Sequence, residues 1–327
     1  MRLGIIGATG LVGREVLAVM EKFNIPLSQL NLYASEKSAG LKIIHNNKEL
    51  SVRFLDDGAL DENDVFISSA GSSIAKKWGK LIRNRGLLLI DNSSVWRMEK
   101  DVPLIVPEIN ADQIKEHHHI IANPNCSTIQ MVLALNPLRK RYGIRRIVVS
   151  TYQAVTGSGQ EAVVQLNDEL AGKVNINKVF PHPIAFNCLP QIDSFSDNGY
   201  TREEIKMVSE TQKIFAEPIP VTATCVRVPT LGGHAESINV ELDSAFDLVE
   251  IKKLLNDAPG VEVLDIPSDS VYPMPLYARG KDMVYVGRIR RDSTLENALN
   301  IWVVTDNLRK GAATNTVQIL KKWMEVC

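Results

Sequence analysis

This chain of 327 residues has few cysteines and almost no net charge. Its four cysteines (126, 188, 225 and 327) form no CxxC pair, which argues against a zinc ribbon and a disulfide framework and favours a reducing, cytoplasmic compartment. The 37 Lys and Arg residues nearly balance the 38 Asp and Glu residues, so no basic face for nucleic acid is expected. A small-molecule partner is the simpler expectation.

Long apolar runs and flexible linkers are also lacking. The longest uncharged run, 120–138, is interrupted by Asn123, Pro124 and the Asn136-Pro137 pair, so it predicts strand, turn and helix and not a membrane span. The first ten residues lack the apolar core of a signal peptide, and we expect the mature chain to begin at Met1. With 45% hydrophobic residues and no repeat or Gly/Ser/Pro-rich linker, the chain predicts two tightly joined domains.

The pattern of apolar residues differs between the two halves of the chain. The first half alternates short apolar runs, such as 3–6, 65–67 and 87–90, with helical windows, which predicts a doubly wound α/β domain with a parallel sheet. Beyond Ile144 the strands are longer (146–154, 221–228, 234–242 and 283–289), which predicts an α+β domain with a mixed sheet. Helical periodicity returns within 241–258 and in the last window, 312–326.

A glycine-rich turn follows the first strand. It consists of Gly7, Ala8, Thr9, Gly10, Leu11, Val12 and Gly13. Glycines at this spacing, between an apolar strand and an amphipathic helix, let backbone N–H groups approach a pyrophosphate. The turn therefore predicts a Rossmann-like dinucleotide site.

The end of the second strand bears on the choice of cofactor. Ser35, Lys37 and Ser38 offer hydroxyls and a cation, which suit the 2′-phosphate of NADP. Glu36 could instead accept a hydrogen bond from a ribose hydroxyl, and a solvated turn would have the same composition. NADP is the favoured prediction.

Cys126 stands where a strand gives way to a helix. At a helix N-terminus the dipole and unpaired N–H groups stabilise a thiolate and can hold an oxyanion, as a nucleophile requires. A buried structural cysteine beside ordinary capping residues fits the residue types equally well.

Among the six histidines, His234 has the most informative position. Alternation places it on the strand face shared with Ile238, Val240 and Leu242, at the strand's mouth, where either a base or a hydrogen-bonded core histidine would fit. The run His117-His118-His119 follows a charged helix, and consecutive side chains diverge, so a solvated turn is favoured over a metal site.

Two further sets of charged residues are candidates for a site. Arg227 shares a strand face with Ala223 and Cys225, and if that face is covered, its guanidinium needs an anion such as a substrate carboxylate. Glu210 and Lys213 lie three apart on a predicted helix, a spacing typical of a surface ion pair as well as of a site.

With these motifs assembled, the chain resembles the aspartate-semialdehyde dehydrogenase family over nearly its whole length. The resemblance rests on blocks that occur in order: GATGLVG (7–13), SAGSS (69–73), DNSS (91–94), VPEIN (106–110), NPNCSTIQM (123–131), STYQAVTGSG (150–159), HPIAFNCLPQID (182–193), TATCVRVPTLGGH (222–234), VGRIRRD (286–292) and WVVTDNLRKGAA (302–313). It implies NADPH-dependent reductive dephosphorylation of L-aspartyl 4-phosphate to L-aspartate 4-semialdehyde. That reaction lies on the route to diaminopimelate, lysine, methionine, threonine and isoleucine.

The resemblance also implies residue roles. Cys126 would be the nucleophile that forms an aspartyl thioester, His234 the general acid/base, and Gln153 the residue that orients the acyl group. Arg227 and Glu210 match positions for the substrate's carboxylate and amino groups, and Arg97, Asn125 and Lys213 match those for phosphate. The cofactor would contact Gly7, Thr9, Gly10, Leu11, Val12, Gly13, Ser35, Lys37, Ser38, Ser72, Asn92, Gly157, Ser158 and Asn307. No metal is expected.

The expected organisation is an NADP-binding domain of residues 1–125 and 306–327 and a catalytic and dimerisation domain of residues 126–305, in a homodimer. Lys37 stands where relatives usually have arginine, which keeps the charge but loses the bidentate fork. The alternatives are a related acyl-phosphate reductase, acting on an N-acetylglutamyl or glyceraldehyde phosphate, and a non-catalytic dinucleotide-binding protein. The joint presence of Arg227 and Glu210 favours a substrate with the two charged groups of a free amino acid over these alternatives.

Overall fold

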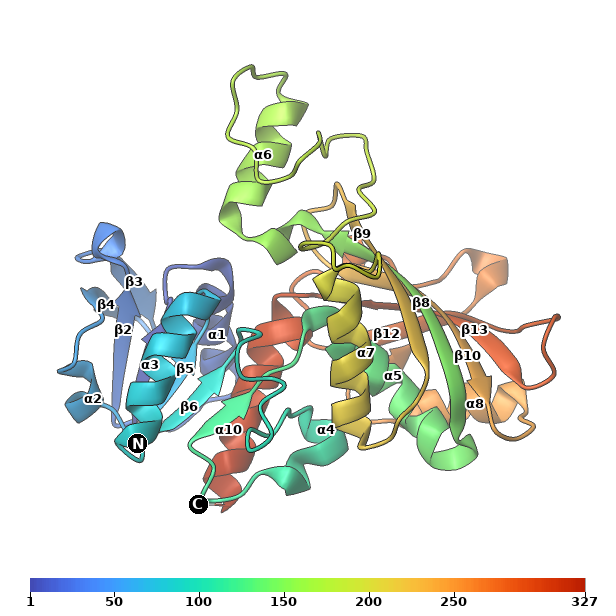
Figure 1. Cartoon of the computed structure of the whole chain (residues 1–327), viewed down its shortest axis with the longest axis horizontal. Coiled ribbons are helices and arrows are strands. Elements are labelled where there is room, and N and C mark those ends of the chain that lie inside the picture. The colour runs from blue at the N-terminus through green and yellow to red at the C-terminus, as the bar shows by residue number, and fades with distance from the viewer. Residues whose placement is uncertain (327) are drawn as a thin grey trace. The chain divides into compact units, whose positions relative to one another are not determined.

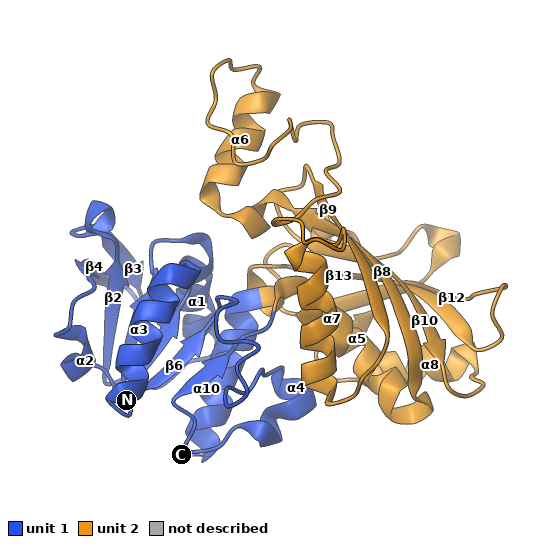
Figure 2. Ribbon diagram, viewed as in Figure 1, with its two compact units in different colours: residues 1–124, 312–327 blue, residues 125–311 orange. Residues whose placement is uncertain are grey.

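The computed structural model describes residues 1–326, which form two compact units (Figure 2). Unit 1 comprises Met1–Pro124 and the segment that begins at Ala312, and unit 2 comprises Asn125–Gly311. The divisions thus follow residues 124 and 311, where the sequence suggests 125 and 305. Among the described residues, no helix is both long and apolar enough to cross a bilayer.

Unit 1 is built on a seven-stranded sheet with the order β3-β4-β2-β1-β5-β6-β7. Five neighbouring pairs run parallel, as expected from the alternating strands and helices. The strands of this parallel part are β1 (Arg2–Ile6), β2 (Gln29–Ala34), β4 (Lys48–Phe54), β5 (Val65–Ser68), β6 (Leu88–Asp91) and β7 (Ile120–Ala122).

Helices cover this sheet on both faces. Helices α1 (Leu11–Lys22) and α10 (Thr314–Val326) share one apolar cluster with alternate strand residues such as Leu3, Ile5 and Ile67. Helix α3 (Ser72–Asn84) packs against β6 (Figure 1). Its buried residues include Trp78 and Ile82. The doubly wound expectation is confirmed. Short helices α2 (Ala59–Glu62) and α4 (Pro107–Asn110) complete the unit.

One edge of this sheet is a hairpin that the sequence analysis does not predict. Strand β3 (Lys42–His45) pairs antiparallel with β4. Asn46 and Asn47 form the two-residue loop with φ values of 48° and 59°, the left-handed conformation that tight hairpin turns require. The apolar pattern does not predict these strands because they are short and mostly polar. The Asn-Asn pair, however, is typical of a two-residue hairpin turn.

Unit 2 contains a mixed six-stranded sheet with the order β11-β12-β13-β10-β8-β9. Pairs β8·β9 and β11·β12 are parallel and the others antiparallel, which confirms the expected mixed sheet. The strands are β8 (Ile144–Ala154), β9 (Val221–Val228), β10 (His234–Leu242), β11 (Val261–Val263), β12 (Val284–Arg291) and β13 (Ala298–Thr305).

Helices α5 (Cys126–Tyr142), α7 (Arg202–Phe215) and α8 (Leu248–Asn256) pack on this sheet, with α5 contacting β8, β10, β12 and β13 (Figure 1). Helix α5 continues through Pro137 to Tyr142. Burial of Leu135, Leu138 and Tyr142 against the unit's core outweighs the lost backbone hydrogen bond. Helices α6 (Gln160–Leu170) and α9 (Pro275–Ala278) lie in excursions between strands.

Candidate active site

A cavity of about 730 Å³ opens in unit 1 at the carboxyl ends of the parallel strands. Strand β2 lies on one side of β1 and β5 on the other, so the strand order reverses direction at β1. Residues that follow β1, β2 and β5 line the cavity. This topological switch point is where open α/β sheets bind their ligands. The cavity therefore has the location expected of a dinucleotide site.

The glycine turn forms one wall of this cavity. Gly7 has a φ of 85°, and a Cβ there would lie 3.0 Å from Ser69 Oγ. A Cβ on Gly13 would overlap the carbonyl oxygen of Gly7, so α1 can pack this close only with glycine at position 13. Gly10 provides no side-chain cap for α1, which leaves the first amides of the helix facing the turn.

The cavity brings together only part of the predicted cofactor set. Gly7, Thr9, Gly10, Ser35 and Lys37 line it. Leu11, Val12, Gly13, Ser38, Ser72 and Asn92 belong to the same unit but do not line the cavity. The cavity also has walls that sequence reasoning missed, from β4 (Phe54 and the adjacent Leu55) and from α3 (Ile74, Lys77 and Trp78). Lys77 adds a second ammonium group to the lining of the cavity, in addition to that of Lys37.

Arg97 and Asn92 lie in the segment after β6. The Nη2 atom of Arg97 donates to the carbonyl of Asn92 (2.8 Å), and the Asn92 side chain donates to Ser68 O and accepts from Thr316 Oγ1 on α10. These contacts hold the Arg97 guanidinium, which is 7% exposed, close to the ends of β5 and β6.

In unit 2, Cys126 is the first residue of α5 and is partly exposed. Asn125 caps this helix: its Oδ1 accepts from the backbone N–H groups of Ser127 (2.9 Å) and Thr128 (3.2 Å). The helix-start position of the thiol is confirmed. Gly311 lies directly against it, because a Cβ at position 311 would be 3.0 Å from the Cβ of Cys126.

His234 is fully buried at the start of β10, on the face shared with Ile238, Val240 and Leu242, as predicted. Its Nδ1 accepts from the Ala154 N–H (3.1 Å), so a neutral ring carries its hydrogen on Nε2. Burial, together with the charge of Arg227, lowers the pKa of His234 to about 3. Near neutral pH the ring is therefore uncharged.

Arg227 lies on the buried face of β9 with Ala223 and Cys225, also as predicted. Its Nη1 donates to Ala154 O (2.7 Å), and burial lowers its pKa while the charges of Glu203 and Cys126 act in the opposite direction. A Cβ on Gly157 would lie 2.9 Å from Arg227 Nη1 and 3.2 Å from His234 Nε2. Arg227, His234 and Gly157 therefore form one packed group.

Gly157, Ser158 and Asn307 are neighbours through one hydrogen bond. Thr156, which precedes Gly157, donates from Oγ1 to Asn307 Oδ1 (3.2 Å). Both elements belong to unit 2, so the structure gathers these three predicted cofactor contacts beside the Arg227 and His234 group.

Helix α7 supplies the acidic groups of this site. The Oε2 atom of Glu210, 1% exposed, accepts from the Asn125 backbone N–H (2.7 Å), so Glu210 is no surface ion-pair residue. Lys213, one turn further on, is half-buried. Glu203, which sequence reasoning missed, accepts from both the Asn125 and the Gln153 side chains. Its sequence context, an acidic residue in the first turn of a helix, is ordinary and gives no signal of this role.

A second missed group lies on the covered face of β10. Glu236 is fully buried, two residues after His234, and Gln130, one helical turn after Cys126, lies beside it. Burial raises the pKa of Glu236 well above its ordinary value. Burial therefore favours the neutral, protonated form of this carboxyl group.

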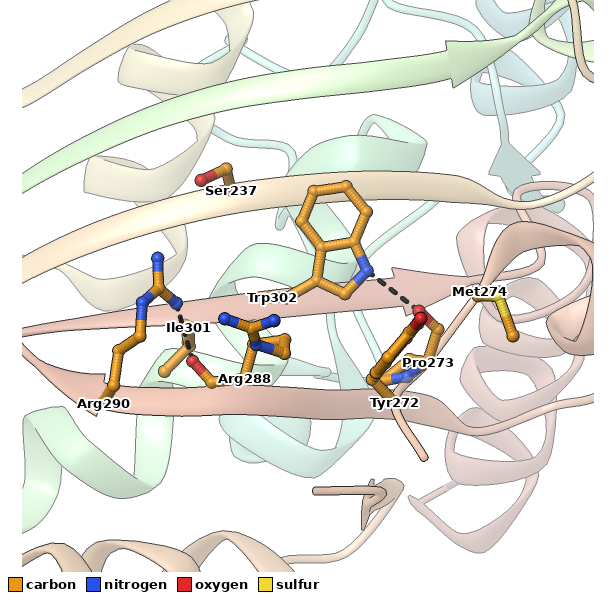
Figure 3. Close-up of a pocket in the computed structure, with 8 residues that line it drawn as sticks. All are labelled: Ser237, Tyr272, Pro273, Met274, Arg288, Arg290, Ile301 and Trp302. Atoms are coloured by element: carbon orange, nitrogen blue, oxygen red, sulfur yellow. Dashed lines mark hydrogen bonds between the residues drawn. The ribbon is translucent and has the colours of Figure 1, made fainter. Parts of the chain in front are cut away.

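A separate cavity of about 330 Å³ lies on the opposite face of the same sheet (Figure 3). Ser237 alternates with Glu236 along β10 and pairs in register with Trp302, so both point away from α5. The walls of this cavity include Tyr272, Arg288 and Arg290. It shares no residue with the group around Cys126.

The histidine run forms no cluster of ligands. His118 Nδ1 accepts from Lys115 N–H, and the rings of His117 and His118 lie 4.5 Å apart. Within residues 1–326, no group of three or more His, Cys, Asp or Glu side chains is arranged to hold a metal ion.

Comparison with known proteins extends these observations. Residues 2–117 match the model of the semialdehyde dehydrogenase NAD binding domain, and residues 135–310 match that of the semialdehyde dehydrogenase dimerisation domain. The fold and site thus define a semialdehyde dehydrogenase, an α/β oxidoreductase of two domains.

Full-length relatives narrow the assignment. The aspartate-semialdehyde dehydrogenase of Aquifex aeolicus is 49% identical, covering 97% of this chain and 96% of its own. The crystal structure of aspartate semialdehyde dehydrogenase II complexed with ASA, from Vibrio cholerae, has a TM-score of 0.95 at 42% identity, covering 99% and 98% of the two chains. The Candida albicans enzyme with NADP has a TM-score of 0.78 at 26% identity, covering 99% and 98%. The chain belongs to the aspartate-semialdehyde dehydrogenase family.

Proposed function

We propose that this protein catalyses the NADPH-dependent reductive dephosphorylation of L-aspartyl 4-phosphate to L-aspartate 4-semialdehyde, in the pathway to lysine, methionine, threonine and isoleucine. The observation that carries the proposal is the placement of a partly exposed thiol at the N-terminus of α5, in the same unit as Arg227, His234, Gln153 and Glu210.

The chemistry follows from the positions of these side chains. Cys126 attacks the acyl carbon, the C–S bond of a thioester forms, and the C–O bond to phosphate breaks. His234 is the proposed general acid/base, and its uncharged ring presents Nε2–H to the site as a donor to the oxygen on which charge develops. Gln153 orients the acyl group. Arg227 and Glu210 bind the substrate's carboxylate and amino groups, and Arg97, Asn125 and Lys213 bind phosphate.

Unit 1 is the proposed NADP-binding domain and unit 2 the catalytic and dimerisation domain. The 730 Å³ cavity, with its close backbone approach at Gly7 and the ammonium groups of Lys37 and Lys77, fits a dinucleotide with a 2′-phosphate. When bound, NADPH supplies the hydride that reduces the acyl group. The proposed contacts are those predicted from the sequence: Gly7, Thr9, Gly10, Leu11, Val12, Gly13, Ser35, Lys37, Ser38, Ser72 and Asn92, with Gly157, Ser158 and Asn307 from unit 2.

We further propose a homodimer and a cytoplasmic location. The dimerisation-domain match covers most of unit 2, and the sheet face opposite α5 carries the aromatic pair Tyr152 and Trp302, whose ring centroids are 5.5 Å apart. None of the described cysteines, Cys126, Cys188 and Cys225, forms a disulfide, which suits a reducing compartment. Cys327 lies outside the described residues.

The test runs the reaction in reverse with aspartate semialdehyde, phosphate and either NADP or NAD, and follows the absorbance of the reduced nicotinamide. Phosphate-dependent reduction of NADP is expected. If neither NADP nor NAD is reduced while a control enzyme is active under the same conditions, the substrate assignment is refuted. Comparison with N-acetylglutamate semialdehyde and glyceraldehyde 3-phosphate separates the related reductases, and NADPH binding without turnover on any of them would indicate a non-catalytic protein.

A further inference from the structure

Glu203 on α7 joins two side chains that are distant in the sequence. Its Oε1 accepts from Asn125 Nδ2 at 2.7 Å and from Gln153 Nε2 at 3.2 Å. Its Oε2 accepts from Lys206 Nζ at 3.2 Å. The residue is 4% exposed, and its bonds to Asn125 and Gln153 are buried, whereas the bond to Lys206 is partly buried.

A carboxylate can only accept hydrogen bonds, and this property determines which way the two amides face. Both Asn125 and Gln153 must turn their NH₂ groups toward Glu203. The Asn125 oxygen is thereby directed to the Ser127 and Thr128 amides, next to Cys126. Thr151 Oγ1 also lies 3.2 Å from Gln153 Nε2, so the amide nitrogen of Gln153 has two acceptors and its oxygen is left for the reacting group.

We propose that Glu203 is a positioning residue: its Oε1 atom holds the amide of Gln153 in the orientation that the acyl group needs and fixes the Asn125 cap beside Cys126. The inference rests on the proposed function, because it assigns Glu203 to that reaction. Lys206 supports it by holding the second carboxylate oxygen, and Asp193 holds the same ammonium at 2.9 Å from the outer side.

A second interpretation of the same geometry is electrostatic. The charge of Glu203 acts on Arg227, so its removal could alter substrate binding without any change in amide orientation. The two interpretations differ in what a neutral acceptor at position 203 should do, and this difference decides the experiment.

The central variant is Glu203→Gln, measured beside the wild type in the phosphorolytic assay. Its amide cannot satisfy both sides, because either its NH₂ group faces the Lys206 ammonium or it faces the two amide donors. We expect kcat to fall by about a hundredfold, the loss typical of a small misplacement of a catalytic group, with KM for aspartate semialdehyde within about twofold of wild type. An unchanged kcat would overturn the inference.

The double variant Glu203→Gln/Lys206→Met separates orientation from charge. Without the ammonium, the amide oxygen of the introduced glutamine can accept from both donors, so we expect most of the lost kcat to return. A double variant as slow as Glu203→Gln would refute positioning by hydrogen bonds. Glu203→Asp withdraws the acceptor by one methylene and keeps the charge; it should lose kcat by about tenfold or more, and wild-type kcat there would count equally against the inference.

Glu204→Gln is the matched control. Glu204 is an equally buried neighbour whose carboxylate accepts from the backbone amides of Thr201 (2.7 Å) and Cys225 (3.0 Å) and makes no bond to Gln153 or Asn125. It should lower the unfolding midpoint but leave kcat at the wild-type value. Equal kcat losses in both variants would mean that α7 acts only as structure. A wild type without turnover would refute the proposed function itself, whereas an active wild type with an unaffected Glu203→Gln refutes this inference alone.

Discussion

Gly311 and Cys126 touch: a Cβ added to Gly311 would lie 3.0 Å from the Cβ of Cys126 and 3.5 Å from its Cα. This spacing is tighter than ordinary van der Waals contact, so Gly311→Ala must push the thiol or the start of α5 aside. Because a displaced nucleophile no longer meets its substrate in a productive geometry, we expect kcat to fall by about tenfold or more.

Steady-state rates and the rate of Cys126 alkylation by iodoacetamide measure this effect. The unfolding midpoint should change little, since one methyl group is added at the edge of the helix. Wild-type values of both rates would show that the added methyl group does not displace Cys126 from its reactive position.

Removal of the thiol should abolish turnover. Cys126→Ala is expected to reduce kcat by at least about a thousandfold, because no other group in the site can form the thioester. NADPH binding, followed by fluorescence titration, should keep its affinity, because the proposed cofactor cavity belongs to unit 1. Appreciable activity in this variant would exclude covalent catalysis.

The buried His234 predicts a stability change on the acid side. Its pKa is about 3 in the folded chain, below the ordinary value of 6.5, so the unfolded chain binds the extra proton as the pH falls below 6.5. The free energy of unfolding should therefore decrease by about 1.4 kcal/mol per pH unit from this residue between roughly pH 6 and pH 4. Denaturant titrations of His234→Asn should show a slope against pH shallower by that amount. Parallel curves would place the histidine pKa near its ordinary value.

Glu236 predicts the opposite dependence. Since its folded pKa is raised, the native chain retains a proton that the unfolded chain loses above about pH 4.5, so its contribution to stability is lost as the pH rises. Glu236→Gln should become more stable relative to wild type by up to about 1.4 kcal/mol per pH unit above pH 5. Glu241→Gln, on the opposite face of β10, is the control and should follow the wild type. A constant difference between Glu236→Gln and wild type would contradict a raised pKa of Glu236.

Cofactor preference should depend on Lys37. Loss of its ammonium removes a charge-assisted contact to the 2′-phosphate, so Lys37→Ala should raise KM for NADP by about tenfold and leave KM for NAD unchanged. Lys76→Ala is a suitable control, because Lys76 is exposed on α3 and does not line the cavity. Equal effects on the two cofactors would indicate that Lys37 does not contact the phosphate.

Sequence patterns predict well wherever one short segment contains the whole signal. Strand β10 begins at His234 and ends at Leu242 as the alternation indicates, and the glycine turn and the helix that begins at Cys126 follow from local residue types. The hairpin at 42–54 is not predicted from the sequence, because tertiary packing decides whether its short, mostly polar strands form.

The supporting residues of the site were beyond local patterns. Glu203 meets Asn125 across 78 positions and Gln153 across 50, and Gly311 meets Cys126 only when the whole of unit 2 has folded. A single sequence contains nothing that pairs such positions. Lys77 was missed for the same reason, since the turn of α3 that brings it to the cavity is visible only in three dimensions.

Helix α5 is buried along most of its length, from Ser127 to Leu135 without a break, between the sheet of unit 2 and helices α7 and α8. Enclosed helices of this kind exchange their amide hydrogens only when the whole domain opens. The nucleophile is therefore attached to the segment of unit 2 that is last to loosen. On heating, catalytic activity and the native fold of unit 2 should be lost at the same temperature. No partly unfolded state with an exposed thiol and no activity should be populated.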